Sequence, residues 1–572
     1  MRQLVLMGLV TLAVGCSDRS STTEAKRTPR DEIVPAALSE SNFPETAAHF
    51  VDVTDRTGIE FVYRNGEEAD RFSILESLGG GIALFDYDGD GDLDLLCTGG
   101  GGFGPGETVH GRPPALFRNE GDWQFTDVTA EAGLNEARYY SHAAVATDYD
   151  NDGFTDVLIT GYGGLALYHN GGDGTFTEIA QSAGLDDRSW SVAAAFGDLN
   201  GDSHPDLYVA HYVNWSFEND PPCLIGPNGQ RDVCPPKQFD PLPDVLFMSN
   251  GDGTFRDASA EAGLREDGKG LGAVMADLDL DGDLDIYVAN DTVDNFLYLG
   301  DGRGRLVERG QQSGVAYNNE GTPDGSMGTD VADFNLDGRP DLWVVNYENE
   351  SLALYRNEGN ALFQHVSQAY GLTLTGGAFV SWGTVFFDAD CDADEDVFIS
   401  NGHVYRAPTH APLRQTPLLF ENHDGERFHN VAPAAGEYTS GPHRGRGAAA
   451  GDIDGDGDWD LVVSHVNEPA ALLANETEHD GHWLSLDLVG TRSSRDAVGT
   501  RVRLRTEGGE QWRQIEGGGS YASTSDRRLF FGLGEAERVE EIEILWPSGT
   551  RQVLNDLTAD RIVQVVEDPA EN

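Results

Sequence analysis

The sequence predicts an all-β protein: a seven-bladed calcium-loop β-propeller followed by a small C-terminal β-sandwich domain. A nine-residue acidic pattern, D-x-[DN]-x-D-x-x-x-D, occurs seven times along the 572 residues. A second element, typified by "FTDVTAEAGL" at residues 125–134, alternates with the acidic pattern and also occurs seven times. Such regular recurrence indicates an array of similar units. Because each unit reads as four strands, the expected array is a β-propeller.

The acidic pattern lies between short apolar runs. "GGGIALF" precedes the first copy and "LDLLCTG" follows it. Runs of this length and composition are typical of strands. Each loop is therefore expected to turn a β-hairpin. An EF-hand is excluded, because it needs flanking helices and a glutamate at position 12.

The two ends of the array predict a closed ring. The array begins with a lone outer strand, "FVDVT", at residues 50–54. Its last unit, which ends in "ALLANET", lacks such a strand. We expect the N-terminal strand to complete the last blade, so that no edge strand is left unpaired.

The spacing of the acidic side chains points to calcium. Hard cations such as Ca²⁺ take about six to eight oxygen ligands. Oxygens at loop positions 1, 3 and 5 can converge on one ion, and the aspartate at position 9 can add a bidentate carboxylate. Up to seven Ca²⁺ ions are expected. The alternative is seven acidic turns that face water.

The predicted ligands are Asp86, Asp88, Asp90 and Asp94 in the first loop; Asp148, Asp150, Asp152 and Asp156 in the second; Asp198, Asn200, Asp202 and Asp206 in the third; Asp277, Asp279, Asp281 and Asp285 in the fourth; Asp333, Asn335, Asp337 and Asp341 in the fifth; Asp388, Asp390, Asp392 and Asp396 in the sixth; and Asp452, Asp454, Asp456 and Asp460 in the seventh. In the first loop, Asp92 is expected to point outward.

Glycine is favoured at position 6 of the loop, because it permits a sharp turn. Five loops have it, whereas Ser203 and Ala393 occupy this position in the third and sixth loops. Those two sites are expected to be weaker. The sequence contains no local cluster of cysteine and histidine, which speaks against zinc.

The composition and charge of the chain argue against one class of partner. The formal net charge is −60 and 39% of residues are hydrophobic. So acidic a chain has nothing to neutralise phosphates, which argues against a nucleic-acid partner. The apolar content suffices for a folded protein.

The N-terminus reads as an export signal. Residues 1–15 combine Arg2 with an apolar stretch and small residues, as in a signal peptide of the lipoprotein type. Cys16 is the expected lipidation site, and residues 16–47 read as a disordered tether. We expect an exported protein, either lipid-anchored at a bacterial membrane, on its periplasmic or cell-surface face, or secreted after a plain signal peptide. Membrane attachment is expected only through this anchor.

The remaining cysteines fall into two kinds. Cys223 and Cys234 flank a loop, and export favours a disulfide between them. Cys97 and Cys391 are expected to stay unpaired.

The repeats resemble FG-GAP/VCBS repeats, the calcium-loop propeller repeats of integrin α-chains, over residues 48–476. Residues 482–567 resemble the ASPIC/UnbV domain, on the stretches "DAVGTRVRL", "GGGSYASTSDRRLFFGLG" and "IEILWPSGTRQ". This combination is similar to the cartilage acidic protein family. The resemblance implies the architecture and leaves the activity open.

Two functions remain open on the sequence. The first is a calcium-stabilised binding or adhesion module that recognises a glycan or an extracellular protein, acting as a monomer. The second is an enzyme acting on an extracellular polysaccharide at the propeller's central mouth. The residues expected to line that mouth are Glu76, His142, Trp190, Trp382 and Arg444. Residues 207–276, with Tyr212 and Trp215, are the expected recognition insertion.

Overall fold

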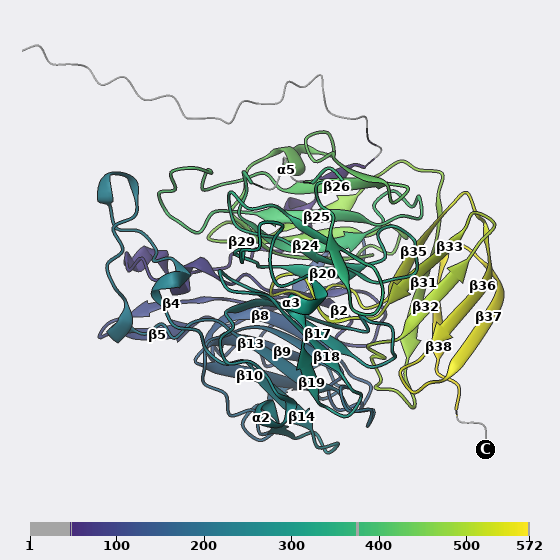
Figure 1. Ribbon diagram of the computed structural model, residues 1–572, viewed down its shortest axis with the longest axis horizontal. Helices are drawn as coiled ribbons and strands as arrows, with labels where there is room; N and C mark the ends of the chain where they lie inside the picture. Colours follow the sequence, from purple (N-terminus) through teal and green to yellow (C-terminus); the bar gives the residue numbers. More distant parts are fainter. Residues whose placement is uncertain (1–45, 47, 373–376, 570–572) are drawn as a thin grey trace, which may run out of the picture. The chain divides into compact units, whose positions relative to one another are not determined.

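The computed structural model describes residue 46, residues 48–372 and residues 377–569 (Figure 1). The expected signal peptide, the tether and the lipidation site at Cys16 lie outside these residues. No helix among the described residues is long and apolar enough to cross a membrane.

Seven mostly four-stranded antiparallel sheets form the larger part of the described chain, consistent with propeller blades. We number them blades 1 to 7 in chain order. Blade 1 contains β2 (Ile82–Phe85), β3 (Asp94–Cys97), β6 (Ala115–Asn119) and β7 (Phe125–Asp127); blade 2 contains β8 (Tyr140–Thr147), β9 (Asp156–Tyr162), β10 (Gly164–Asn170) and β11 (Phe176–Glu178); blade 3 contains β12 (Ser191–Gly197), β13 (Asp206–His211), β14 (Val245–Ser249) and β15 (Phe255–Asp257); blade 4 contains β16 (Gly270–Ala276), β17 (Asp285–Asn290), β18 (Phe296–Gly300) and β19 (Leu306–Glu308).

The later blades repeat this order. Blade 5 contains β20 (Thr329–Ala332), β21 (Asp341–Val344), β22 (Ala353–Asn357) and β23 (Phe363–His365); blade 6 contains β24 (Ser381–Phe387), β25 (Asp396–Asn401), β26 (Leu418–His423) and β27 (Arg427–Asn430); blade 7 contains β28 (Gly445–Gly451), β29 (Asp460–His465), β30 (Ala471–Asn475) and β1 (Phe50–Asp52). The first-named strand in each blade is its inner strand. Each acidic loop joins the inner strand to the second strand.

The ring closes as the sequence predicts. β1 pairs antiparallel with β30, with Phe50 opposite Asn475. Inner strands contact one another in succession, and β28 of blade 7 contacts β2 of blade 1. β1 therefore supplies the fourth strand of blade 7, so that β30 is not left as an edge strand.

The outer strands are short, and helical turns follow four of them. These turns are α1 (Thr54–Thr57), α2 (Ser259–Ala262), α3 (Gly310–Ser313) and α5 (Glu437–Ser440).

The glycine of each "AGL"-type element has a packing role between blades. Gly184 has a φ of +83°, and a Cβ there would lie 2.6 Å from the carbonyl oxygen of Phe255 in the next blade. Gly436 makes the same approach to Phe50 at the ring closure, at 2.2 Å. A side chain at either position would push neighbouring blades apart.

Segments outside the blade strands cover the end of the blades away from the acidic loops. They include the hairpin β4 (Gly101–Gly104) with β5 (Thr108–Gly111) and the 3₁₀ turns η2 (Glu67–Ala69), η3 (Ile74–Ser77), η4 (Phe217–Asn219), η5 (Pro227–Gly229) and η6 (Pro236–Gln238).

The C-terminal residues form two further sheets. One contains β35 (Leu529–Gly534), β31 (His482–Val489) and β38 (Arg561–Val566); the other contains β33 (Glu510–Gln514), β32 (Arg501–Arg505), β36 (Arg538–Leu545) and β37 (Arg551–Thr558) (Figure 1). Buried side chains from both sheets, such as Leu486 and Ile542, share one apolar cluster. This arrangement is consistent with a small β-sandwich.

One segment of this C-terminal part runs between the inner strands of the blades. We call residues 516–526 the axial segment; it includes β34 (Gly517–Gly518), which pairs with β16. It makes backbone or side-chain contacts with the inner strand of every blade described: β2, β8, β12, β16, β20, β24 and β28. Because it touches all of them, it lies where the inner strands converge.

Candidate metal-binding loops and the opposite face

The acidic loops share one backbone arrangement, illustrated by the second loop. The Asp148 carboxylate accepts hydrogen bonds from the N–H groups of Asp152, at 3.0 Å, and Gly153, at 2.8 Å. The Asp152 carboxylate accepts one from the N–H of Phe154 at 2.9 Å. Equivalent bonds recur around the ring. The loop is therefore held in a fixed turn by its own carboxylates.

The aspartate at position 9 has a role that the sequence does not reveal. Asp94 accepts hydrogen bonds from the N–H groups of Tyr87, at 2.9 Å, and Asn119, at 2.8 Å. It thereby fastens the loop to the third strand of its own blade. Asp206 and Asp460 make the same pair of bonds in blades 3 and 7. The two carboxylate oxygens of the position-9 aspartate would still have free lone pairs with which to bind an ion.

Carboxylate oxygens converge in at least three of the loops. Ligand atoms lie within 4.8 Å of one another in three sets of aspartates. These sets are Asp86, Asp88 and Asp90; Asp148, Asp150 and Asp156; and Asp277, Asp279 and Asp285. Two further predicted ligand oxygens, Asp341 Oδ2 and Asp390 Oδ1, are buried without a hydrogen-bond partner. Burying an unpaired carboxylate oxygen costs free energy, so this donor set fits a hard cation.

Left-handed backbone occurs at two positions of each loop. Position 6 has a φ of +97° at Gly91 and of +101° at Gly457. Ser203, at +72°, and Ala393, at +88°, adopt the same conformation without being glycine. Position 4 is also left-handed throughout, with Leu280 at +65° as one example. Such a backbone costs a residue with a side chain about 1–2 kcal/mol.

Burial raises the pKa of several loop carboxylates. It raises the pKa of Asp94 to about 8 and that of Asp206 to about 8, and neighbouring carboxylates add to the rise in both. Burial likewise raises the pKa of Asp341 to about 9, with Asp333 and Asp337 as the repelling neighbours. A bound cation would remove this repulsion.

Asparagine side chains connect successive loops. The Asn119 amide donates to the carbonyl of Leu93 in its own blade and to that of Ile453 in the seventh loop, at 3.1 and 2.8 Å. Asn475 donates to the carbonyl of Ala389 in the sixth loop at 2.9 Å. The backbone of one loop is thus coupled to the strand end of the next blade.

The five residues expected at the central mouth do not line an open channel. Glu76, His142, Trp190 and Trp382 are buried, with at most 3% of their surface exposed. The Trp190 indole donates to His142 Nε2 at 2.8 Å, and burial lowers the pKa of His142 to about 3. The axial segment contacts the inner strands in the region where the sequence predicts a ligand-binding mouth.

Arg444 differs from the other four because it lines a surface cavity of about 570 Å³. Its guanidinium pairs with Glu67 at 2.9 Å. Arg406, from the segment after β25, also lines this cavity and pairs with Glu76 at 2.5 Å. We call this the arginine cavity; Arg64, Glu67, Glu68, Asp70, Arg406, Leu413, Arg444 and Asn467 line it.

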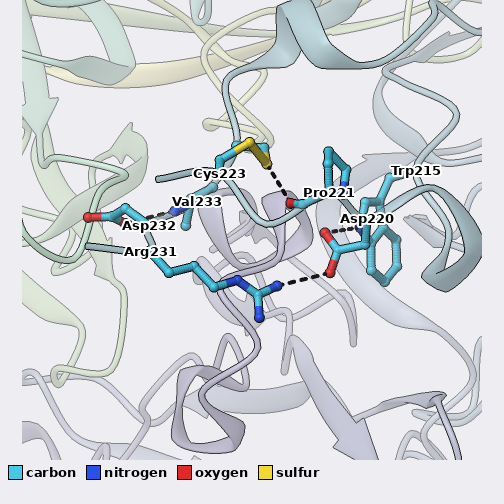
Figure 2. Close-up of a disulfide and its surroundings, with 8 residues drawn as sticks. Trp215, Asp220, Pro221, Cys223, Arg231, Asp232 and Val233 are labelled. Carbon is cyan, nitrogen blue, oxygen red and sulfur yellow. Dashed lines mark hydrogen bonds and ion pairs between the residues drawn. A yellow bond between two sulfur atoms is a disulfide. The ribbon is translucent and has the colours of Figure 1, made fainter. Parts of the chain in front are cut away.

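The insertion in blade 3 carries a disulfide between Cys223 and Cys234, the pair expected from the sequence (Figure 2). Close to it, Arg231 pairs with Asp220 at 3.4 Å, and Asp220 accepts a bond from the Trp215 indole at 3.1 Å (Figure 2). Trp215 and Tyr212 are buried, at 3% and 2% exposure. The expectation that these two aromatic side chains face a ligand is therefore wrong: they pack in the core, where the Trp215 ring lies 5.3 Å from that of Tyr162 and the Tyr212 ring lies 5.2 Å from that of Trp190.

The exposed apolar residues of the insertion are at its tip instead. Leu224 is 64% exposed and Ile225 is 43% exposed. The Asp232 carboxylate accepts bonds from the N–H groups of Arg406, at 3.0 Å, and Ala407, at 2.9 Å. The disulfide loop is thus tied to the segment that supplies Arg406 to the arginine cavity.

Comparison with known proteins identifies the two parts of the chain. A model of FG-GAP-like repeats matches residues 86–159, 148–209, 239–288, 277–344 and 333–399, and the ASPIC and UnbV model matches residues 490–572. Cartilage acidic protein 1 of Mus musculus is 25% identical over 494 residues, covering 75% of this chain and 73% of that protein. The Homo sapiens protein is 25% identical over 443 residues, and the match spans 62% of its length.

Solved structures of lower similarity also match. A lectin from Agrocybe aegerita that recognises non-reducing terminal N-acetylglucosamine aligns over 68% of this chain and 87% of its own, with 16% identity and a TM-score of 0.36. The BP39L lectin from Burkholderia pseudomallei aligns over 70% of this chain and 97% of its own, with 11% identity and a TM-score of 0.41. By its sequence matches, the chain is an FG-GAP-like repeat protein with a C-terminal ASPIC and UnbV domain, distantly homologous to cartilage acidic protein 1.

Proposed function

We propose that this protein is a calcium-binding, exported cell-surface module that recognises a glycan or an extracellular protein. Calcium in the blade loops of a seven-bladed propeller has a structural role in this proposal. The observation that carries it is the convergence of aspartate oxygens in loops whose backbone is already fixed.

Calcium would act by removing repulsion at the ends of the blade hairpins. Each loop gathers three or four carboxyl or amide side chains within a few residues. Because an ion that binds only the folded state stabilises that state, each occupied loop adds to the stability of its blade. The asparagine contacts between loops would transmit this stabilisation around the ring.

In this proposal, the ligand binds to the face of the blades away from the acidic loops. The arginine cavity presents guanidinium, carboxylate and amide groups next to Leu413, a mixture that suits a polar ligand such as a sugar. Leu224 and Ile225 add an exposed apolar tip on a disulfide-closed loop. A closed loop loses less conformational freedom on binding than an open one.

Export and anchoring complete the proposal. A signal of the lipoprotein type with lipidation at Cys16 would hold the protein at a bacterial membrane surface, and a plain signal would release it.

The test is retention of the calcium-loaded protein on immobilised polysaccharides, cell-wall fractions and extracellular proteins. We expect specific retention that weakens in Arg444→Gln or in the double variant Leu224→Ser with Ile225→Ser. A matched control exchanges Ile562 and Val566 for serine, since they are 46% and 50% exposed on β38. Folded protein that is retained on none of these materials would contradict the proposal.

The alternative, an enzyme acting on a polysaccharide at the central mouth, finds less support. The axial segment occupies the region where the inner strands converge, and all five expected mouth residues are buried. We therefore place ligand recognition at the arginine cavity and the disulfide loop.

A further inference from the structure

Three side chains that are typical metal ligands meet at a place the calcium loops do not account for. Cys391 Sγ lies 3.8 Å from Asp458 Oδ1, and His479 Nε2 lies 3.0 Å from the same oxygen. The three ligand atoms all lie within 4.8 Å of one another. They come from blade 6, blade 7 and the connection to the C-terminal domain, so they do not form a local sequence motif.

The loop geometry explains why two of these side chains are free to meet. Cys391 is at position 4 of the sixth acidic loop, and Asp458 is at position 7 of the seventh. Neither position belongs to the predicted calcium ligands, whose side chains are at positions 1, 3, 5 and 9. Leucine occupies position 4 in the fourth and fifth loops, at Leu280 and Leu336. The backbone at this position therefore does not require cysteine.

The donor set differs from that of calcium. One sulfur, one imidazole nitrogen and one carboxylate oxygen form a set that zinc accepts and that a hard, oxygen-preferring cation does not. With metal–ligand bonds of about 2.0–2.3 Å, neighbouring ligands of a tetrahedral zinc lie roughly 3.3–3.6 Å apart. The observed separations of 3.0 and 3.8 Å bracket this range.

The surroundings favour a metal over a reactive thiol. Cys391 is 1% exposed, so its thiol is shielded from solvent. Nδ1 of His479 is buried and makes no hydrogen bond within the described residues. A neutral imidazole with its proton on Nδ1 would present Nε2 to a metal.

We propose that Cys391, Asp458 and His479 bind one Zn²⁺ ion that joins the sixth loop, the seventh loop and the connection to the C-terminal domain. Zinc replaces the thiol proton, which passes to solvent, and forms bonds to sulfur, nitrogen and oxygen. Asp458 and His479 also line an open cavity of about 660 Å³, from which a water molecule can take the fourth position.

The experiment uses the full chain in millimolar-range calcium, so that the aspartate loops stay filled. A zinc-selective pyridyl chelator strips bound zinc, and the protein is then titrated with Zn²⁺ or with Co²⁺ as a spectroscopic substitute. We expect one Zn²⁺ per chain and, with Co²⁺, a thiolate-to-metal charge-transfer band. Cys391→Ser removes the band, and His479→Ala weakens zinc binding by more than roughly 100-fold, beyond the loss of an outer-shell partner.

Two matched variants control for the other candidates nearby. Cys97→Ala removes the other free thiol of the described residues, which is buried in blade 1. His482→Ala removes a histidine three residues from His479 that pairs with Asp560 at 2.8 Å. Both variants should keep the band and the zinc stoichiometry. Calcium stoichiometry should not change in any of these variants.

A measurement on the unaltered chain keeps the test independent of whether the variants fold. Zinc should slow alkylation of Cys391 in the calcium-loaded protein, as mapped by peptide mass spectrometry. Absence of a charge-transfer band, unchanged zinc binding in Cys391→Ser, or alkylation that zinc does not slow would each overturn the proposal. The three residues would then form only a hydrogen-bonded pair beside a buried thiol.

Discussion

The hydroxyl oxygen of Tyr521 accepts a hydrogen bond from the backbone N–H of Gly79 at 3.1 Å. Tyr521 belongs to the axial segment, and Gly79 immediately precedes the inner strand of blade 1. The tyrosine ring is fully buried and lies edge-on to Trp382, with ring centroids 4.8 Å apart. A side chain that follows the last repeat by more than forty residues thus completes the packing between the inner strands.

Removing this side chain should destabilise the whole protein. We expect Tyr521→Ala to lower the free energy of unfolding by about 3–5 kcal/mol, as for other buried aromatic truncations. Tyr521→Phe keeps the ring and loses only the hydrogen bond, at about 1 kcal/mol. Urea denaturation in calcium measures both. Equal effects of the two variants would mean that the ring itself contributes little.

We expect that a single loop can lose its calcium ion without the unfolding of its blade. Asp86→Asn should lower the calcium stoichiometry by one, because it removes a charged ligand from position 1 of the first loop. Asp92→Asn serves as the control, since Asp92 is exposed and is expected to point outward. Isothermal titration of both variants checks this. Loss of an ion in the control would show that the ligand positions are assigned wrongly.

The sixth loop should gain from glycine at its strained position. Ala393 has a φ of +88°. We expect Ala393→Gly to stabilise the calcium-loaded protein by about 1 kcal/mol, because it removes left-handed strain. Thermal denaturation of this variant, beside Ala389→Gly in the same loop, provides the measurement. Destabilisation by Ala393→Gly would show that the alanine methyl packs usefully.

Stability should respond to pH in opposite directions with and without calcium. Burial raises the pKa of Asp94 from its ordinary value of 3.8 to about 8. The folded state therefore binds a proton more tightly than the unfolded state does. Without calcium, this contribution is fully present below pH 3.8 and is lost as the pH rises through about 8. With calcium, the ionised carboxylate is required, so stability should rise with pH.

Thermal denaturation between pH 5 and pH 8, in calcium and in a calcium chelator, tests this inversion. The part due to Asp94 is the difference between the wild-type protein and Asp94→Asn. The same slope with and without calcium would indicate that the loops do not bind it.

The sequence allowed the repeat and its acidic loops to be predicted because both follow from local patterns. Acidic positions recur at fixed spacing, and strand patterns flank them, so the seven sheets and the pairing of β1 with β30 follow from reading along the chain. The position-6 turn could also be predicted, because glycine there signals a left-handed backbone. The disulfide followed from two cysteines eleven residues apart.

Contacts that do not follow from the repeat pattern could not be predicted. Nothing in "GGGSYASTSDRR" indicates that Tyr521 reaches Gly79, 442 residues away. The expected mouth residues are buried, and the axial segment that packs against one of them, Trp382, is not part of the repeat pattern. Cys391, Asp458 and His479 meet through the ring geometry, so no local motif in the sequence indicates that these three side chains lie together.

The most direct test of this account is the number of calcium ions that the intact chain binds, measured by native mass spectrometry and by titration calorimetry at neutral pH. The account predicts up to seven ions, with the third and sixth loops filling last, and a rise in the denaturation temperature as the loops fill. A chain that binds no calcium, and whose denaturation temperature calcium does not change, would contradict it.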